Sequence, residues 1–156
     1  MGWLAQRQTL DPHFPSTVQG VVSRGSWPRT SRFRGLNREK RKQVSVALER
    51  VGMLAMANNT IDALSGGQFQ RMLFARMWLQ QAPLVMLDEP FTGVDEVTSQ
   101  LLMEQIVDMH QQGQTILAVL HDSERVSRYF PQTLRLDGVS ASWGATLPQA
   151  QEVCLA

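Results

Sequence analysis

The chain has 156 residues, of which 43% are apolar, and a formal net charge of +1. This length fits one domain or part of one, and the apolar fraction allows a packed core and argues against a disordered tail. The near-neutral charge gives no general attraction to nucleic acid, and a single cysteine, Cys154, excludes a disulfide framework. The longest apolar run, 116–120, is too short to span a membrane, and the first residues lack the pattern of a signal peptide. We therefore expect a cytoplasmic protein that acts at a membrane only as a peripheral subunit.

The beginning of the chain is ambiguous in secondary structure until a first helix signal appears. Ser16 with Gln19 has the capping-box spacing, which predicts a short helix over 17–24. Gly25 suits the end of this helix, because glycine readily adopts the left-handed conformation that often follows a last turn.

A second helix is predicted from Asn37 to about Val51, where apolar residues recur at intervals of three and four and Gly52 ends the pattern. Positive side chains gather in and before this helix. The cluster consists of Arg24, Arg29, Arg32, Arg34, Arg38, Lys40, Arg41 and Lys42. We interpret it as a solvated face, near anionic lipid headgroups at most. A nucleic-acid site is disfavoured, because the cluster, whose only aromatic residues are Trp27 and Phe33, lacks the regular aromatic interleaving that single-strand binders use for stacking.

The segment Leu64-Ser65-Gly66-Gly67-Gln68 has the form of a phosphate-binding helix start. Ser65 can cap the following helix, predicted over 66–81, and Gln68 stands where a capping-box partner belongs. Gly66 and Gly67 leave their backbone N–H groups unshielded by a Cβ, so an anion can approach closely. The helix dipole adds partial positive charge at the same point.

The segment Val85-Met86-Leu87-Asp88-Glu89-Pro90 reads as a short apolar strand that ends in two acids. A continuous apolar run over 84–87 is typical of a parallel strand covered on both faces. A carboxylate such as Asp88 at a strand end can hold Mg²⁺, and its neighbour Glu89 can take a proton from water.

A strand, helix and strand follow in order. Asp95 is a plausible N-cap for a helix over 96–111, and 115–120 is a second apolar run of the buried-strand type. Such a βαβ unit has a right-handed crossover in nearly all cases. The second strand delivers His121 at its end, followed by Asp122 as the cap of another helix. Residues 133–138 and 140–144 predict a closing hairpin.

LSGGQ followed by VMLDEP resembles the ATP-binding cassette (ABC) ATPases, where these are the signature and Walker B motifs. The resemblance implies an α/β fold, a partial P-loop NTPase, with a helical subdomain over 7–82, part of a mostly parallel sheet over 83–144 and a tail over 145–156. The pattern "D..FP.TV..VV..G" over 11–25 is similar to the ATPases of zinc, manganese or iron importers.

The resemblance also implies roles for individual residues in a head-to-tail dimer of two such subunits. ATP held by the other subunit would be bound by the signature residues Ser65, Gly66, Gly67 and Gln68, and Asp95 would cross the interface. Asp88 would hold Mg²⁺, and Glu89 would activate water. The γ-phosphate would be sensed by His121 and Gln6, and Gln6 would also touch Mg²⁺ or the water. Two alternatives remain open: that Asp95 acts only as a helix cap, and that Gln6 is simply an exposed polar residue.

A phosphate loop of the form G-x-x-x-x-G-K-[ST] is missing from the sequence, whose only lysines are Lys40 and Lys42. We therefore expect the carboxyl-terminal part of a transporter ATPase that works with ATP, Mg²⁺, a second ATPase subunit, a membrane permease and, indirectly, a binding protein outside the membrane. A non-catalytic interaction module remains the alternative. A DNA-repair ATPase is disfavoured, because no sustained heptads precede the signature.

Overall fold

The computed structural model describes residues 2–4, 16–25, 38–136 and 139–146. The predicted features at Gln6, at Asn37 and beyond residue 146 lie outside the described residues. The chain divides into two compact units after Val119. The elements of the first unit are β1 (Gly2–Leu4), α1 (Val18–Ser23), α2 (Arg38–Arg50), the 3-10 turns η3 (Leu54–Met56) and η4 (Ile61–Ala63), α3 (Gly66–Gln80), β2 (Leu84–Asp88), α4 (Glu96–Gln111) and β3 (Thr115–Val119). Those of the second unit are α5 (Ser123–Tyr129), β4 (Gln132–Leu136) and β5 (Ala141–Ala145).

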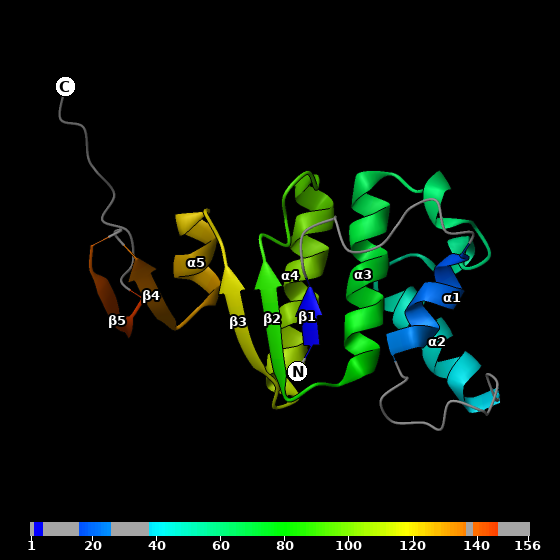
Figure 1. Cartoon of the computed structure of the whole chain (residues 1–156), viewed down its shortest axis with the longest axis horizontal. Coiled ribbons are helices and arrows are strands. Elements are labelled where there is room, and N and C mark those ends of the chain that lie inside the picture. The colour runs from blue at the N-terminus through cyan, green and yellow to red at the C-terminus, as the bar shows by residue number, and fades with distance from the viewer. Residues whose placement is uncertain (1, 5–15, 26–37, 137–138, 147–156) are drawn as a thin grey trace. The chain divides into compact units, whose positions relative to one another are not determined.

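A parallel sheet forms the centre of the first unit, with the strand order β1-β2-β3. β2 pairs with β1 on one side and with β3 on the other, and Leu84 lies opposite Thr115 while Asp88 lies opposite Val119. The connection from β2 to β3 runs through α4, which lies behind the strands in Figure 1. The predicted βαβ unit is therefore confirmed.

The two faces of this sheet differ in burial. Val85 and Leu87 of β2 are buried on the face toward α4, while Leu84 and Met86 on the opposite face are only half-buried. On β3, Leu117 is 47% and Val119 is 53% exposed. The expectation that both strands are covered on both faces is wrong for β3, because its side chains on this face leave about half of their surface exposed.

The helices α1, α2 and α3 pack together beside the sheet and bury an apolar core of their own. Val18, Val22, Leu48 and Met72 are all fully buried there. Thr17 caps α1 by accepting from the Gly20 N–H at 3.3 Å, so the predicted Ser16 cap is wrong by one residue. Ser16 is instead buried and accepts a hydrogen bond from Arg24.

Gly25 serves a different purpose from the one predicted. It follows the end of α1, but a Cβ at this position would lie 2.3 Å from the backbone carbonyl oxygen of Arg76 on α3. The glycine is therefore required by the close approach of two backbones rather than by a left-handed helix end.

The other predicted helix ends agree with the structure. Gly52 (φ +65°) and Gly113 (φ +91°) lie in the left-handed region after α2 and α4. α3 ends at Gln80, where Gln81 adopts a left-handed conformation (φ 43°), so the helix has already ended before Pro83. The turns η3 and η4 were not predicted, since three-residue turns leave no periodic pattern in a sequence.

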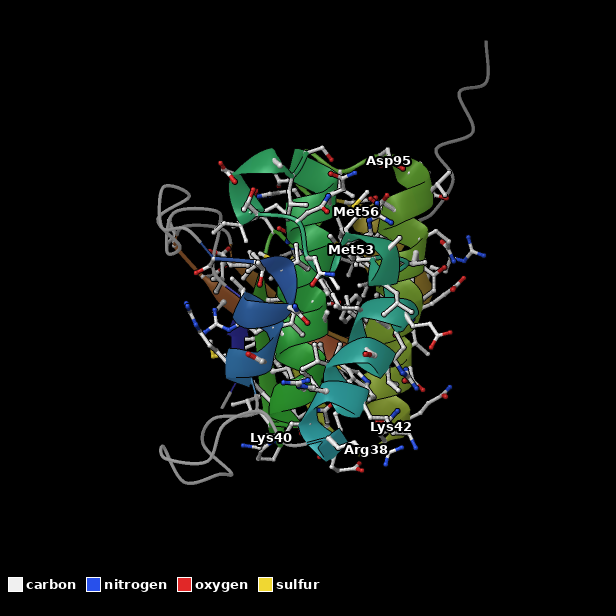
Figure 2. The ribbon with its side chains drawn as sticks, turned by 90° about the vertical axis from the view of Figure 1, so that its right-hand side faces the viewer. Arg38, Lys40, Lys42, Met53, Met56 and Asp95 are labelled. Carbon is white, nitrogen blue, oxygen red and sulfur yellow. The ribbon has the colours of Figure 1, made fainter. Side chains whose placement is uncertain are left out.

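Apart from Arg24, which follows α1 and donates to Ser16, the described members of the basic cluster lie at the start of α2. Arg38, Arg41 and Lys42 are exposed and Lys40 is half-buried. Figure 2 shows Arg38, Lys40 and Lys42 at one end of the first unit, opposite to the end that carries Asp95. The cluster is therefore separate from the edge where the predicted phosphate-binding residues lie.

The second unit is small and open. Asp122 caps α5 by accepting from the Arg125 N–H at 3.0 Å, and β4 pairs antiparallel with β5 as the predicted hairpin. Leu134, Leu136 and Trp143 are 49%, 70% and 66% exposed. Across the described residues of both units, no helix has the length and apolar character needed to cross a membrane.

Arg50 joins three helices of the first unit. At the end of α2, it donates to Gln105 Oε1 at 3.3 Å and pairs with the carboxylate of Asp108, both on α4. Its guanidinium also lies 4.7 Å from the ring centroid of Trp78 on α3. The side chain thus combines hydrogen bonds with a cation–π contact, which a lysine could reproduce only in part.

We predict that Arg50→Ala lowers the free energy of unfolding by about 1–2 kcal/mol, because the contacts to α3 and α4 are lost together. Arg50→Lys should lose roughly half as much, since the charge is kept and the planar stacking is not. Urea denaturation followed by circular dichroism measures both. Equal stability of Arg50→Ala and the parent would contradict this account of how the helices are joined.

Candidate functional site

The signature segment forms the start of α3 as the sequence predicts. Ser65 Oγ accepts from the Gln68 N–H at 3.3 Å, and Gln68 Oε1 accepts from the Ser65 N–H at 2.9 Å. This complete capping box fixes the chain in the first helical turn. The N–H groups of Gly66 and Gly67 then belong to the turn that has no intrahelical acceptors. The geometry suits an anion at the helix start.

The starts of α3 and α4 are neighbours. A Cβ on Gly67 would have Asp95 Oδ2 as its nearest atom, at 3.8 Å. Asp95 caps α4 by accepting from the Thr98 N–H at 2.9 Å. Figure 2 shows Asp95 at the upper end of α4, at the same edge of the unit. Glycine at position 67 keeps the surface between these two helix starts clear of side-chain atoms.

The capping hydrogen bonds also lower the pKa of Asp95. The Thr98 backbone N–H is the largest cause, followed by the Thr98 side chain, and the positive charge of Arg71 contributes in the same direction. Asp95 is therefore a carboxylate at neutral pH. Its cap role is confirmed by the contact to Thr98, and the predicted role at a dimer interface stays a prediction.

Asp88 and Glu89 lie at the carboxyl end of β2, where open α/β sheets bind their ligands. Asp88 is half-buried and lies opposite Val119, so its side chain is on the uncovered face of the sheet. The Glu89 N–H donates to the Val119 carbonyl at 3.1 Å. The pairing of β2 with β3 therefore extends up to Glu89, which is where the chain turns away.

Glu89 turns the chain in a conformation that side chains rarely adopt. Its φ is 45°, and among the described residues other than glycine only Gln81 shares a positive φ. Such a residue costs on the order of 1–3 kcal/mol and persists where the surrounding contacts require it. Strain of this kind is concentrated at functional sites, which makes Glu89 a candidate on structural grounds as well as on motif grounds.

Two residues that the sequence did not single out hold this turn. Thr92 donates its hydroxyl to Glu89 Oε2 at 3.0 Å, and its N–H donates to the Glu89 carbonyl at 3.2 Å. Gln70 on α3 donates to the Pro90 carbonyl at 2.9 Å. In the sequence, the threonine three residues after Glu89 was the available signal for the Thr92–Glu89 contact. The contact of Gln70 with Pro90 had no such signal.

Two predicted site residues, Gln6 and His121, are not among the described residues of the first unit. Gln6 lies outside the described residues. His121 is exposed and belongs to the second unit, two residues beyond the end of β3. The roles assigned to both stay predictions from the sequence.

The residues present fit Mg²⁺ and a nucleotide when the two are considered together. No group of three or more His, Cys, Asp or Glu side chains that could hold a metal by itself occurs among the described residues. Mg²⁺ is, however, commonly held by one or two carboxylates together with substrate phosphates and water. Asp88 and Glu89 offer such carboxylates, so the donor set fits a metal that arrives with its nucleotide.

Comparison with known proteins agrees with these motifs. The family model described as "ABC transporter" matches residues 1–92. The chain belongs to the ABC transporter family. It is 33% identical over 144 residues to the manganese transport system ATP-binding protein MntB of Halalkalibacterium halodurans, covering 92% of this chain and 58% of the relative. It is 36% identical over 137 residues to the zinc transport system ATP-binding protein TroB of Treponema pallidum, covering 88% and 52%.

The comparison with solved structures shows the same fold. A dimeric structure of a bacterial ABC transporter cassette superposes with a TM-score of 0.74 at 24% identity, covering 86% of this chain and 57% of the cassette. The α/β class with a parallel sheet, predicted as part of a P-loop NTPase, is thereby confirmed. The ABC chain described here spans about half the length of the curated relatives it matches. The division into subdomains at residue 82 stays a prediction.

We predict that the free energy of unfolding of Glu89→Gly is about 1 kcal/mol higher than that of Glu89→Ala. Glycine adopts a φ of 45° without the steric cost of a Cβ. Chemical denaturation of the two variants measures the difference. The matched control is Glu104, exposed in the middle of α4, where Gly should be less stable than Ala by about 1 kcal/mol. The same sign at both positions would show that Glu89 is not strained.

Proposed function

We propose that this chain is the catalytic and signature-bearing part of an ATP-hydrolysing subunit in an ABC importer for metal ions. The observation that carries the proposal is the turn at the end of β2, where Glu89 is held in a left-handed conformation and by the Thr92 hydroxyl. A carboxylate fixed in this way beside a second carboxylate suits the activation of a water molecule. The names of the manganese and zinc relatives support the choice of metal ions as the transported substrate.

The proposed mechanism divides the work between residues at the carboxyl end of β2 and two residues assigned from the motif resemblance. Asp88 would hold the Mg²⁺ that arrives with ATP, and Glu89 would orient a water molecule and accept its proton as that water attacks the γ-phosphate. Thr92 positions the Glu89 carboxylate. His121 and Gln6 contact the γ-phosphate or its Mg²⁺ once the nucleotide is bound, and both assignments rest on the motif resemblance.

The signature segment is proposed to act on ATP held by a second subunit. Ser65, Gly66, Gly67 and Gln68 form a helix start that offers backbone N–H groups to a γ-phosphate. The dimeric cassette with the same fold supports this arrangement. Asp95, adjacent to Gly67, would then lie at the dimer interface. A membrane permease is the partner through which hydrolysis drives transport, so the subunit works at the cytoplasmic side of a membrane without spanning it.

A non-catalytic interaction module is the second candidate, and the missing phosphate loop favours it. Without the backbone cradle and lysine of that loop, the β- and γ-phosphates lose their main contacts. We predict that the isolated chain binds Mg-ATP with a dissociation constant of about 1 mM or weaker. Calorimetry at millimolar nucleotide measures this. A micromolar constant, about −8 kcal/mol, would mean that the chain contains a phosphate site not recognised here.

We predict that joining the chain to an amino-terminal cassette lobe with a phosphate loop gives Mg-dependent ATP hydrolysis. In this protein, Glu89→Gln should lower turnover by a factor of about 10²–10⁴ because the amide cannot accept the proton. Mg-ATP should still bind through Asp88 and the added loop, so ATP-bound dimers should accumulate. Phosphate release and light scattering measure the two effects.

Ser65→Arg is the matched control for this experiment. It should block dimer closure by its bulk and charge at the helix start, so hydrolysis and ATP-bound dimers should both be lost. Turnover of Glu89→Gln at the parent rate would remove Glu89 from the role of general base, and accumulation of dimers in Ser65→Arg would remove the signature segment from the interface.

A further inference from the structure

The positive charge of the chain is concentrated in one segment. Eight of the 15 lysines and arginines lie within residues 24–42, together with only one of the 14 acids, Glu39. The rest of the chain carries seven positive and 13 negative side chains. The net charge of +1 therefore combines a strongly basic segment with an acidic remainder. Such a segment attracts anions to one place on a molecule that otherwise repels them.

Four of these cations lie together at the start of α2. We call them the basic patch, which consists of Arg38, Lys40, Arg41 and Lys42. Lys40 is half-buried and the other three are exposed. Within the described part of the chain, no ion pair engages Arg38, Arg41 or Lys42. Their charges are therefore directed to whatever lies outside this end of the helix.

The start of a helix is an unfavourable place for positive charge. The backbone N–H groups of the first turn already give it partial positive charge, so cations there lower the stability of the helix. Glu39 is the only acid in the first turn of α2, beside Arg38, Lys40 and Arg41. Sequences that break a local rule in this way are expected to do so at functional sites. The basic patch therefore calls for a functional reason.

The composition of α2 distinguishes between the anionic partners that could meet this patch. Val44, Ala47 and Leu48 are buried, which fixes the helix in the first unit, and Val46, at 37%, is its only exposed large apolar side chain. Protein interfaces need apolar or aromatic anchors at their centre and are depleted in lysine. Single-strand nucleic-acid sites need aromatic stacking, and α2 contains no aromatic residue. A surface of anionic lipid headgroups binds clustered Lys and Arg side chains through charge alone.

The orientation of the first unit allows such a surface to bind without covering the signature segment. Figure 2 shows Arg38, Lys40 and Lys42 at one end of this unit and Asp95 at the other. Asp95 in turn adjoins Gly67, at the helix start that suits an anion. A flat surface that contacts the basic patch therefore leaves the start of α3 accessible.

We propose that the basic patch is a docking surface for an anionic lipid bilayer, which it contacts directly through the phosphate groups of the lipids. The first unit then meets the membrane with the start of α2, and the signature segment points away from it. This inference rests on the charge, exposure and placement of α2 and not on ATP hydrolysis. A chain that hydrolyses no ATP binds the same membrane.

The test uses the full 156-residue chain and vesicles made of phosphatidylglycerol and phosphatidylcholine in equal parts. Sedimentation should carry the chain down with these vesicles at about 0.1 M salt, and vesicles of phosphatidylcholine alone should leave it in solution. At about 1 M salt the chain should be released, because the screening length falls from about 10 Å to about 3 Å. Inorganic phosphate should release no more chain than sodium chloride of the same ionic strength, since the site is a surface and not a pocket for a free anion.

Three double variants separate the patch from the total charge. Arg41→Gln with Lys42→Gln should weaken vesicle binding about tenfold or more, because each cation near an anionic surface contributes about fivefold. Arg41→Lys with Lys42→Arg keeps both charges and should bind within about twofold of the parent. The matched control, Arg128→Gln with Arg135→Gln, removes two exposed cations from the second unit and should also change binding less than about twofold. Circular dichroism verifies that all three remain folded.

The direction in which the chain meets the membrane is measured with a fluorescent label. Gln43, beside the patch, and Val97, two residues after Asp95, are both exposed and are replaced by cysteine one at a time. Cys154→Ser removes the natural cysteine in both proteins. A quencher on the lipid headgroups should dim the label at position 43 more strongly than the label at position 97.

Several outcomes would overturn the proposal. Equal binding to uncharged vesicles would do so, as would equal losses in the two glutamine variants, because total charge and not the patch would then decide. Stronger quenching at position 97 would place the opposite end of the unit at the membrane. Tighter binding to duplex or single-stranded DNA than to the anionic vesicles at the same salt would assign the patch to nucleic acid. Failure of the lobe-joined chain to hydrolyse ATP would contradict the proposed function and leave the docking surface standing.

Discussion

The pairing of β2 with β3 is the interaction on which the rest of the site depends. Five residue pairs join the two strands, and the Val119 carbonyl accepts from the Glu89 N–H just beyond the last of them. Because that bond holds Glu89 against β3, the chain can leave the sheet only by turning sharply at this residue. The turn gives Glu89 its positive φ and brings Thr92 within hydrogen-bonding distance of its carboxylate. The geometry of the carboxylate proposed as the general base thus follows from a strand pairing.

The helices beside the sheet hold the signature segment in relation to the same turn. α3 carries the capped start at Ser65, and the side chain of Gln70, one turn along, donates to the carbonyl of Pro90. The capped helix start and the two carboxylates are therefore linked through one helix and one loop. The contacts of Arg50 join α3 to α2 and α4.

The features that could be predicted from the sequence are those that depend on neighbouring residues. The caps at Ser65 and Asp95 need only a side chain and an N–H three residues away, and both are present. The role of Gly25 could not be predicted, because it depends on the carbonyl of Arg76 on another helix. The strain at Glu89 and the contact of Gln70 to Pro90 also arise from tertiary structure, to which local patterns are blind. The apolar run over 115–120 predicted the strand β3 but not its exposure, since burial depends on which elements cover the sheet.

The exposed face of β3 is informative for that reason. Full burial of a Val or Leu side chain stabilises a protein by about 1.5–3 kcal/mol, and a whole domain is stable by only about 5–15 kcal/mol. A sequence that places Leu117 and Val119 where they remain half exposed forgoes a substantial part of that stability. The half-buried Asp88 lies on the same face, at the same end of the sheet. The exposed apolar face and the half-buried carboxylate therefore lie together at the end of the sheet where open α/β sheets bind their ligands.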